Sequence, residues 1–180
     1  LYDSYEQDRR DRERAALFFD RINPSAYQDL YNHGLSLYLH VLEVITDITR
    51  SSRTDMFDAP TISIDSPIGR IIIGSAGDDI HKGPFAVVID FGGNDTYECD
   101  TRTKADHAAW PVQLVVDFSG DDVYIGGSHS LASAVGGVSI VVDVEGNDTY
   151  RTGDFTQGSG VIGVGILHDL KGSDTYLSGQ

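Results

Sequence analysis

The chain has little of several features on which proteins commonly depend. Cys99 is its one cysteine, which excludes a disulfide framework and a cysteine-based zinc site within a single chain. It contains no run of 18 apolar residues, so the sequence predicts no membrane span. Only 13 lysines and arginines stand against 28 aspartates and glutamates, and the net charge of −15 argues against nucleic acids and anionic membranes as partners.

Two common catalytic signatures are missing as well, namely a Gly-Lys-Ser/Thr phosphate loop and a nucleophile elbow. What the chain does have is aspartate. In residues 61–180, 15 of the 17 acidic residues are Asp, whereas residues 1–60 carry a mixed set of 7 basic and 11 acidic residues. A merely solubilising surface would use Glu as freely as Asp, so this bias indicates turn chemistry or cation ligation.

The aspartates belong to a repeat in which an apolar triplet is followed by Asp-x-x-Gly-x-Asp-x-Tyr. Four copies have their first aspartates at Asp90, Asp117, Asp143 and Asp169, spaced 27, 26 and 26 residues apart. A degenerate fifth copy, Ile71 to His81, lies 16 residues upstream. A fixed period in the twenties indicates stacked supersecondary units, with each triplet a buried strand and the Asp-x-x-Gly-x-Asp segment the turn that ends it.

This repeat predicts a mainly β protein, a parallel β-helix (solenoid) of about five coils of about 26 residues over 61–180. Before it, residues 4–22 and 25–50 have helical patterns, the second with a wide apolar stripe that must be buried. We expect residues 1–60 to form an N-terminal helical cap over the first coil, with 51–60 as a polar linker.

The last repeat ends only four residues before Gln180. A solenoid that stopped there would leave an uncovered strand edge, which repeat proteins normally cover. We therefore expect a truncated solenoid from a longer precursor. Its open C-terminal end would pack on another protein chain, on the precursor remainder or on a second copy in a homo-oligomer.

If equivalent residues stack, the aspartates form two columns with rungs ~4.8 Å apart. Neighbouring carboxylates would then repel by about 3 kcal/mol at an effective dielectric of 20. Bound cations would compensate, and oxygen ligands favour Ca²⁺. The alternative is that the aspartates cap turns by accepting backbone N–H groups, and the two roles can coexist. The predicted metal ligands are Asp90, Asp95, Asp117, Asp122, Asp143, Asp148, Asp169 and Asp174.

The tyrosines of the repeat should form a third column, with stacked rings supporting the rungs and hydroxyls reaching solvent. Its members are Tyr97, Tyr124, Tyr150 and Tyr176. In the last triplet, His168 occupies an aliphatic position, which we interpret as a tolerated edge residue.

The Gly-x-Asp-x-Tyr segments, such as Gly93–Tyr97 and Gly146–Tyr150, resemble the second half of the repeats-in-toxin nonapeptide. That resemblance implies a calcium-loaded parallel β-roll of a secreted bacterial protein. The longer Asp-x-x-Gly-x-Asp-x-Tyr pattern is also similar to repeats in bacterial proteins of uncharacterised function.

Catalytic candidates are few. His107 and Ser133 occupy corresponding positions of adjacent coils, Asp106 directly precedes His107, and the three have the composition of a nucleophilic triad. Neighbouring residues of a strand point to opposite faces, however, which separates Asp106 from His107. We expect a structural, assembly or interaction role in an extracellular or cell-surface setting, with the periplasm as a variant. The alternative is a hydrolase or polysaccharide-acting enzyme, or the non-catalytic part of a processed one.

Overall fold

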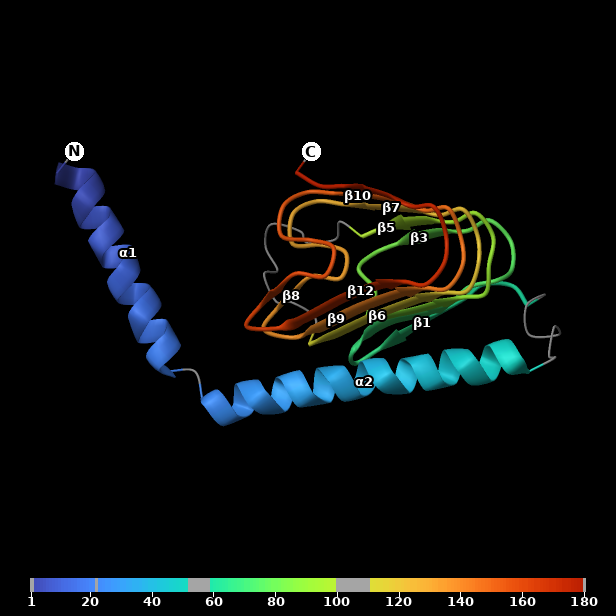
Figure 1. The fold of residues 1–180 in the computed structure, drawn as a ribbon, viewed down its shortest axis with the longest axis horizontal. Helices are drawn as coiled ribbons and strands as arrows, with labels where there is room; N and C mark the ends of the chain where they lie inside the picture. The colour runs from blue at the N-terminus through green and yellow to red at the C-terminus, as the bar shows by residue number, and fades with distance from the viewer. Residues whose placement is uncertain (1, 22, 52–58, 100–110, 180) are drawn as a thin grey trace.

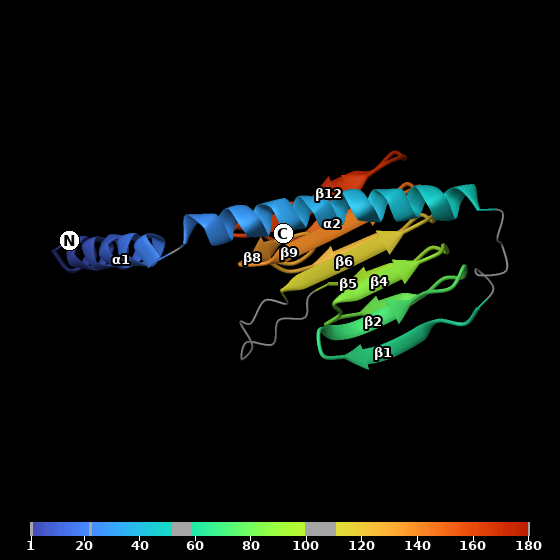
Figure 2. The ribbon, with the colours of Figure 1, turned by 90° about the horizontal axis from the view of Figure 1, so that it is seen from below.

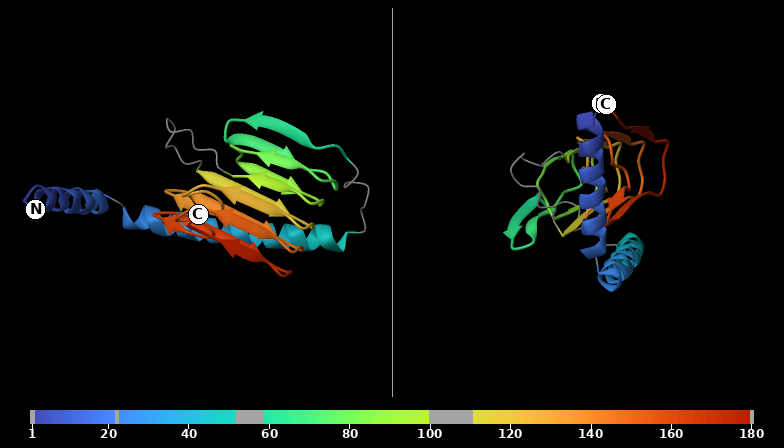
Figure 3. Two further views of the ribbon diagram at one scale, coloured as in Figure 1. Left: turned by 90° about the horizontal axis from the view of Figure 1, so that it is seen from above. Right: turned by 90° about the vertical axis from the view of Figure 1, so that its left-hand side faces the viewer.

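The computed structural model describes residues 2–21, 23–51, 59–99 and 111–179. The predicted linker falls mostly at 52–58, and Asp106 and His107 fall in 100–110, so these predictions lie outside the described residues. Within the described chain, two helices precede a succession of short strands stacked as rungs, from the green first strands to the red last ones (Figures 1 and 3). The fold is therefore mainly β, a β-solenoid, as the repeat predicts.

Two parallel sheets form the main walls of the solenoid. The larger one, here the outer sheet, contains β1 (Ile62–Ser66), β2 (Gly69–Ile73), β4 (Val87–Asp90), β6 (Val112–Asp117), β9 (Val138–Asp143) and β12 (Val164–Asp169) in that order. The tyrosine sheet contains β3 (Ile80–Lys82), β5 (Thr96–Glu98), β7 (Val123–Gly126), β10 (Thr149–Thr152) and β13 (Thr175–Leu177). A third pair, β8 (Ala134–Val135) and β11 (Gly160–Val161), lies between them in the later coils.

The register confirms that equivalent residues stack. Asp117 pairs with Asp90 on one side and with Asp143 on the other, and Tyr124 pairs in the same way with Tyr97 and Tyr150. β1 alone is antiparallel, because it forms a hairpin with β2. This hairpin covers the edge of the outer sheet at the first rung.

The solenoid makes about three turns, fewer than the five coils predicted. The first repeat is followed by the next after only 16 residues, which is too short for a complete turn. The last repeat contributes β12 and β13, and no later strand of the described chain continues the coil. Neither repeat therefore adds a complete turn. The number of repeats in the sequence thus overestimates the number of closed coils.

The helical segment does not lie where we predicted it. α2 (Pro24–Arg50) begins after an Asn23 cap, whose side chain accepts the Ser25 N–H at 3.0 Å. Instead of covering the first coil, it crosses the outer sheet and contacts β9 and β12 (Figure 2). Val41 and Ile45 are buried there in one cluster with strand residues such as Val142.

The reason is that the outer sheet is apolar on both faces. Val88, Val115 and Val141 point into the solenoid core, whereas the alternating residues point outward. The outward set includes Val116, Ile140 and Val142. These residues need cover from water, and α2 provides it.

α1 (Tyr2–Arg21) packs against no other element of the described chain. No helix of the described residues is long and apolar enough to cross a membrane.

Candidate metal centre in the solenoid interior

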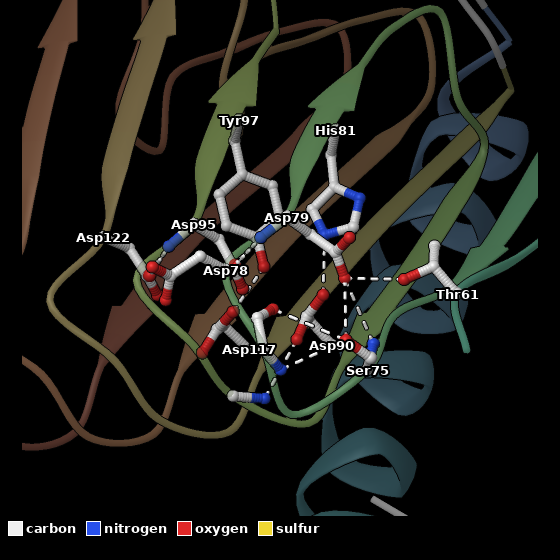
Figure 4. Close-up of polar contacts among 12 residues, drawn as sticks. Thr61, Ser75, Asp78, Asp79, His81, Asp90, Asp95, Tyr97, Asp117 and Asp122 are labelled. Carbon is white, nitrogen blue, oxygen red and sulfur yellow. Dashed lines mark hydrogen bonds and ion pairs between the residues drawn. The ribbon is translucent and has the colours of Figure 1, made fainter. Parts of the chain in front are cut away.

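Two columns of aspartates border the turn that joins the outer sheet to the tyrosine sheet. The strand column stands at the ends of the outer-sheet strands and consists of Asp90, Asp117, Asp143 and Asp169. The turn column directly precedes the tyrosine-sheet strands and consists of Asp79, Asp95, Asp122, Asp148 and Asp174. In Figure 4 both columns point toward each other across the turn.

These carboxylates lie inside the protein. Asp90, Asp117 and Asp143 are 0% exposed, and Asp95, Asp122 and Asp148 are 1% exposed. Asp79, Asp169 and Asp174, near the two ends of the columns, are half-buried. Burying so many ionisable groups is unfavourable unless they are neutralised or well hydrogen-bonded.

The strand column is held by the tyrosine column. The first three tyrosine hydroxyls donate to the strand-column carboxylate of the following rung: Tyr97 to Asp117, Tyr124 to Asp143 at 2.7 Å and Tyr150 to Asp169 at 3.1 Å. The last one, Tyr176, donates to Asp169 of its own rung at 2.9 Å. The rings stack with centroids 4.5–4.7 Å apart. Since Tyr97, Tyr124 and Tyr150 are fully buried, the prediction that the tyrosine hydroxyls reach solvent was wrong for these three.

His81 takes the tyrosine position in the first rung. It pairs in register with Tyr97, and the two rings are tilted with their centroids 4.9 Å apart. Its Nε2 lies 2.6 Å from Asp90 Oδ2. Gly74 stands where the later repeats have the strand-column aspartate, and a Cβ there would lie 1.7 Å from the same Asp90 oxygen. Glycine at this position therefore leaves room for the Asp90 carboxylate beneath the imidazole.

The turn column forms a second ladder, to the backbone. Oδ1 of Asp95 accepts the N–H of Asp79, Oδ1 of Asp122 accepts that of Asp95, and Oδ1 of Asp148 accepts that of Asp122, at 2.6–2.8 Å. The other oxygen of the three, Oδ2 of Asp95, Asp122 and Asp148, is buried and has no hydrogen-bond partner among the described residues. A buried carboxylate oxygen without a donor calls for a proton or a cation as its partner.

Turn capping, one of the two predicted roles of the aspartates, is present. Oδ1 of Asp90 accepts the Gly92 N–H, and Oδ1 of Asp117 accepts the Ser119 N–H, both at 2.9 Å. Asp143 differs, because its Oδ1 is buried without a partner in the described chain. Backbone donors therefore satisfy only part of the two columns.

The carboxylates raise one another's pKa. Burial first, then neighbouring aspartate charges, raises the pKa of Asp117 to about 10 and that of Asp143 to about 8. Burial likewise raises the pKa of Asp95 to about 7 and those of Asp122 and Asp148 to about 6, although a backbone hydrogen bond opposes the rise in each. Near neutral pH, the interior thus holds either protons or other cations.

The two columns approach closely enough to share an ion. Four groups have one ligand atom per residue with all three atoms within 4.8 Å: Asp79/His81/Asp90, Asp90/Asp95/Asp117, Asp117/Asp122/Asp143 and Asp148/Asp169/Asp174. Carboxylate oxygens are hard ligands, which suit Ca²⁺, Mg²⁺ and Mn²⁺ rather than soft metals. All eight predicted metal ligands belong to these groups.

The glycine of each Asp-x-x-Gly-x-Asp turn allows this approach. A Cβ on Gly120 would lie 1.6 Å from the carbonyl oxygen of Gly93, and one on Gly146 would lie 1.9 Å from that of Gly120. Consecutive turns therefore touch backbone to backbone at the glycines.

Several site residues were missed from the sequence. His81 belongs to the first group, and its signal was its place in the degenerate repeat. Asp79 of the same group was expected in an aspartate column but not among the metal ligands. A further, exposed ladder runs outside the columns: Oδ1 of Asp78, Asn94 and Asp121 accepts the N–H of Asn94, Asp121 and Asn147. Its signal was the Asn or Asp that precedes the first four turn-column aspartates.

Of the three catalytic candidates, Ser133 alone lies in the described chain. Ser133 is 7% exposed and its Oγ lies 3.1 Å from Ser159 Oγ. Its two predicted partners, Asp106 and His107, lie in the part that is not described. The triad stays a prediction.

Comparisons with protein-family models, with curated proteins and with solved structures found no match to this chain. The resemblance to the repeats-in-toxin nonapeptide therefore stays a prediction. The class of protein rests on the fold and the site themselves, a β-solenoid with a buried double column of aspartates.

Proposed function

We propose that this protein is a divalent-cation-binding β-solenoid with a structural role, and that Ca²⁺ is the ion it binds. The observation that carries the proposal is the set of buried turn-column oxygens without partners, Oδ2 of Asp95, Asp122 and Asp148. Each of these three aspartates belongs to a group that also contains strand-column aspartates, with one ligand atom per residue and all three atoms within 4.8 Å of one another. A cation placed between the columns would satisfy these oxygens and neutralise their charge.

The donor set supports calcium among the divalent ions. Three of the four groups offer carboxylates alone, and Ca²⁺ accepts six to eight oxygen ligands in flexible geometry. Each carboxylate has two oxygens, so three aspartates can supply several of these ligands. Mg²⁺ demands near-ideal octahedral geometry and retains several waters, which suits a dry interior less well.

Cation binding would be coupled to folding, because the ligands come from different rungs. In the Asp117/Asp122/Asp143 group, two residues belong to one repeat and the third to the next. An ion bound there links neighbouring rungs and is lost when they separate. Ligand at 100 times its dissociation constant stabilises a protein by about 2.7 kcal/mol per site.

The proposal is tested by thermal unfolding in excess EDTA and in millimolar CaCl₂, with elemental analysis of the purified protein. We expect a calcium-dependent rise in Tm of about 5–10 °C, since about 1 kcal/mol shifts Tm by roughly 2–4 °C at this size. KCl at matched ionic strength controls for screening, and MgCl₂ tests selectivity. Equal Tm values in EDTA and calcium, together with no bound metal, would refute the proposal.

The interaction role and the extracellular location stay predictions. β12 and β13 are the last strands of their sheets in the described chain, and Tyr176 and Val161 near this edge are 47% and 43% exposed. An exposed edge of this kind can pair with another strand. Analytical ultracentrifugation of the chain over a range of concentrations tests for self-association there.

A further inference from the structure

The metal-ligand groups are not independent of one another. Asp117 belongs both to the Asp90/Asp95/Asp117 group and to the Asp117/Asp122/Asp143 group. The Asp148/Asp169/Asp174 group shares no residue with either. The remaining group, Asp79/His81/Asp90, shares Asp90, but there the His81 Nε2 already lies 2.6 Å from Asp90 Oδ2, so we assign it no ion. Of the three groups that contain carboxylates alone, the geometry joins two and separates the third.

Asp117 lies where it can bridge the two groups. Its Oδ1 accepts the Ser119 N–H and its Oδ2 accepts the Tyr97 hydroxyl, so each oxygen has one hydrogen bond. A carboxylate has about four lone-pair positions, which leaves one on each oxygen for a metal. Neighbouring rungs are ~4.8 Å apart, which is somewhat longer than the roughly 3.5–4 Å between the ions of two-metal sites but within reach of one bridging carboxylate.

Each of the two joined groups also contains an oxygen that needs a partner. In the first group this oxygen is Asp95 Oδ2. In the second group there are two, Asp122 Oδ2 and Asp143 Oδ1. All three are buried without a hydrogen-bond partner in the described chain. The separate group has Asp148 Oδ2. By contrast, both oxygens of Asp90 have hydrogen bonds, one of them to the imidazole of His81.

The charges agree with two ions in the joined groups. These groups contain five different aspartates because Asp117 is shared. Two divalent cations neutralise four of the five carboxylates, and His81 hydrogen-bonds to the outermost one, Asp90. One divalent ion would leave three of the five carboxylates to be neutralised by protons or to stay charged, and buried charges are costly at this spacing.

We infer that the solenoid binds a pair of divalent cations bridged by Asp117, and a third, separate cation at Asp148, Asp169 and Asp174. This inference rests on the proposed function and adds to it the number of ions and their coupling. The paired ions bind cooperatively, because the first one fixes the shared carboxylate in place for the second.

The test uses Mn²⁺ as the probe and counts bound ions in variants. Wild type should bind three Mn²⁺ ions per chain after gel filtration. Asp117→Asn should bind one, since it damages both joined sites, whereas the matched variant Asp174→Asn should bind two. Circular dichroism verifies that each variant is folded.

A measurement on wild type keeps the test valid if Asp117→Asn does not fold. Electron paramagnetic resonance of the fully loaded protein should show the broad spectrum of a coupled Mn²⁺ pair, with a six-line signal of about one isolated ion. Three isolated six-line ions, or an Asp117→Asn variant that loses only one ion, would overturn the bridged pair while leaving cation binding intact. If wild type binds no Mn²⁺ and no Ca²⁺, the proposed function fails and the inference fails with it.

Discussion

The Tyr124 hydroxyl donates a 2.7 Å hydrogen bond to Asp143 Oδ2 on the next rung, and both side chains are fully buried. The same relationship joins Tyr97 to Asp117 and Tyr150 to Asp169. Through it, the aromatic column of the tyrosine sheet fixes the position of the acidic column of the outer sheet. The spacing of the repeat therefore creates the candidate site as well as the fold.

Removing this hydroxyl should destabilise the protein without changing the ring stack. Tyr124→Phe leaves a buried carboxylate oxygen unpaired, and we expect a loss of about 1–3 kcal/mol in the free energy of unfolding. Tyr176→Phe is the matched control, because Tyr176 is 47% exposed and Asp169 also accepts from Tyr150. Denaturant titration should show a clearly smaller loss for the control, and equal losses would contradict this account of the tyrosine column.

The turn glycines should tolerate no side chain. In Gly146→Ala, the new Cβ would lie 1.9 Å from the backbone oxygen of Gly120, so the rungs must separate, and we expect a loss above about 4 kcal/mol. Gly136→Ala is the control, since a Cβ there meets nothing within 4 Å although φ is +73°. The cost at Gly136 should be about 1–2 kcal/mol from the backbone alone. A mild effect at Gly146 would show that the turns are not in close contact.

Without divalent cations, stability should fall as the pH rises. The pKa of Asp143 is raised from its ordinary value of 3.8 to about 8 and that of Asp117 to about 10, because they are buried. Their contribution is fully present below pH ~3.8 and is lost as the pH rises through 8 and 10, because the folded state then binds more protons than the unfolded one. In EDTA, Tm should decrease from pH 5 to pH 9, and calcium should reduce the decrease. A Tm in EDTA that stays level or rises over this range would argue against buried, protonated aspartates.

The sequence predicts well which residues stack on one another, but it does not predict which side chains of one column contact those of another. The constant 26- to 27-residue spacing is enough to place Asp117 beside Asp143 and Tyr124 beside Tyr150, because one-residue slips would misalign every rung. The same spacing does not reveal which aspartate each tyrosine hydroxyl contacts across the interior. That pairing depends on how the turn orients the side chains, so the Tyr-to-Asp bonds and the role of His81 were missed.

The position of α2 was missed for a different reason. An apolar triplet reads as a buried strand whether a helix or the solenoid core covers its second face. Only the structure shows that the outward residues need α2, and that Tyr38 on this helix lies 2.7 Å from Nδ1 of His168. His168, interpreted as a tolerated edge residue, is thus a polar contact between β12 and the helix.

The docking of α2 can be measured with two neighbouring residues. Both residues belong to α2. Ile45, on the face that packs on the outer sheet, is 6% exposed, whereas Val44 is 55% exposed. Ile45→Ala should cost about 2–4 kcal/mol, because it removes buried methyl groups and leaves a cavity. Val44→Ala should change the free energy of unfolding by under ~1 kcal/mol. Similar losses at both positions would mean that the helix does not bury this face.

The most direct test of the cation-binding account compares Asp122→Asn with Asp121→Asn. The two substitutions make the same chemical change at adjacent residues, but Asp122 is 1% exposed in the candidate metal centre and Asp121 belongs to the exposed ladder, where Asn94 and Asn147 stand in the neighbouring rungs. An asparagine at 122 can still accept the Asp95 N–H, so the backbone ladder is preserved.

The quantity to measure is the difference in Tm between millimolar calcium and EDTA. We predict that Asp121→Asn retains the wild-type difference and that Asp122→Asn loses a large part of it, with little change of its Tm in EDTA. Equal calcium-dependent shifts in both variants would contradict the account, and the aspartate columns would then be turn caps alone.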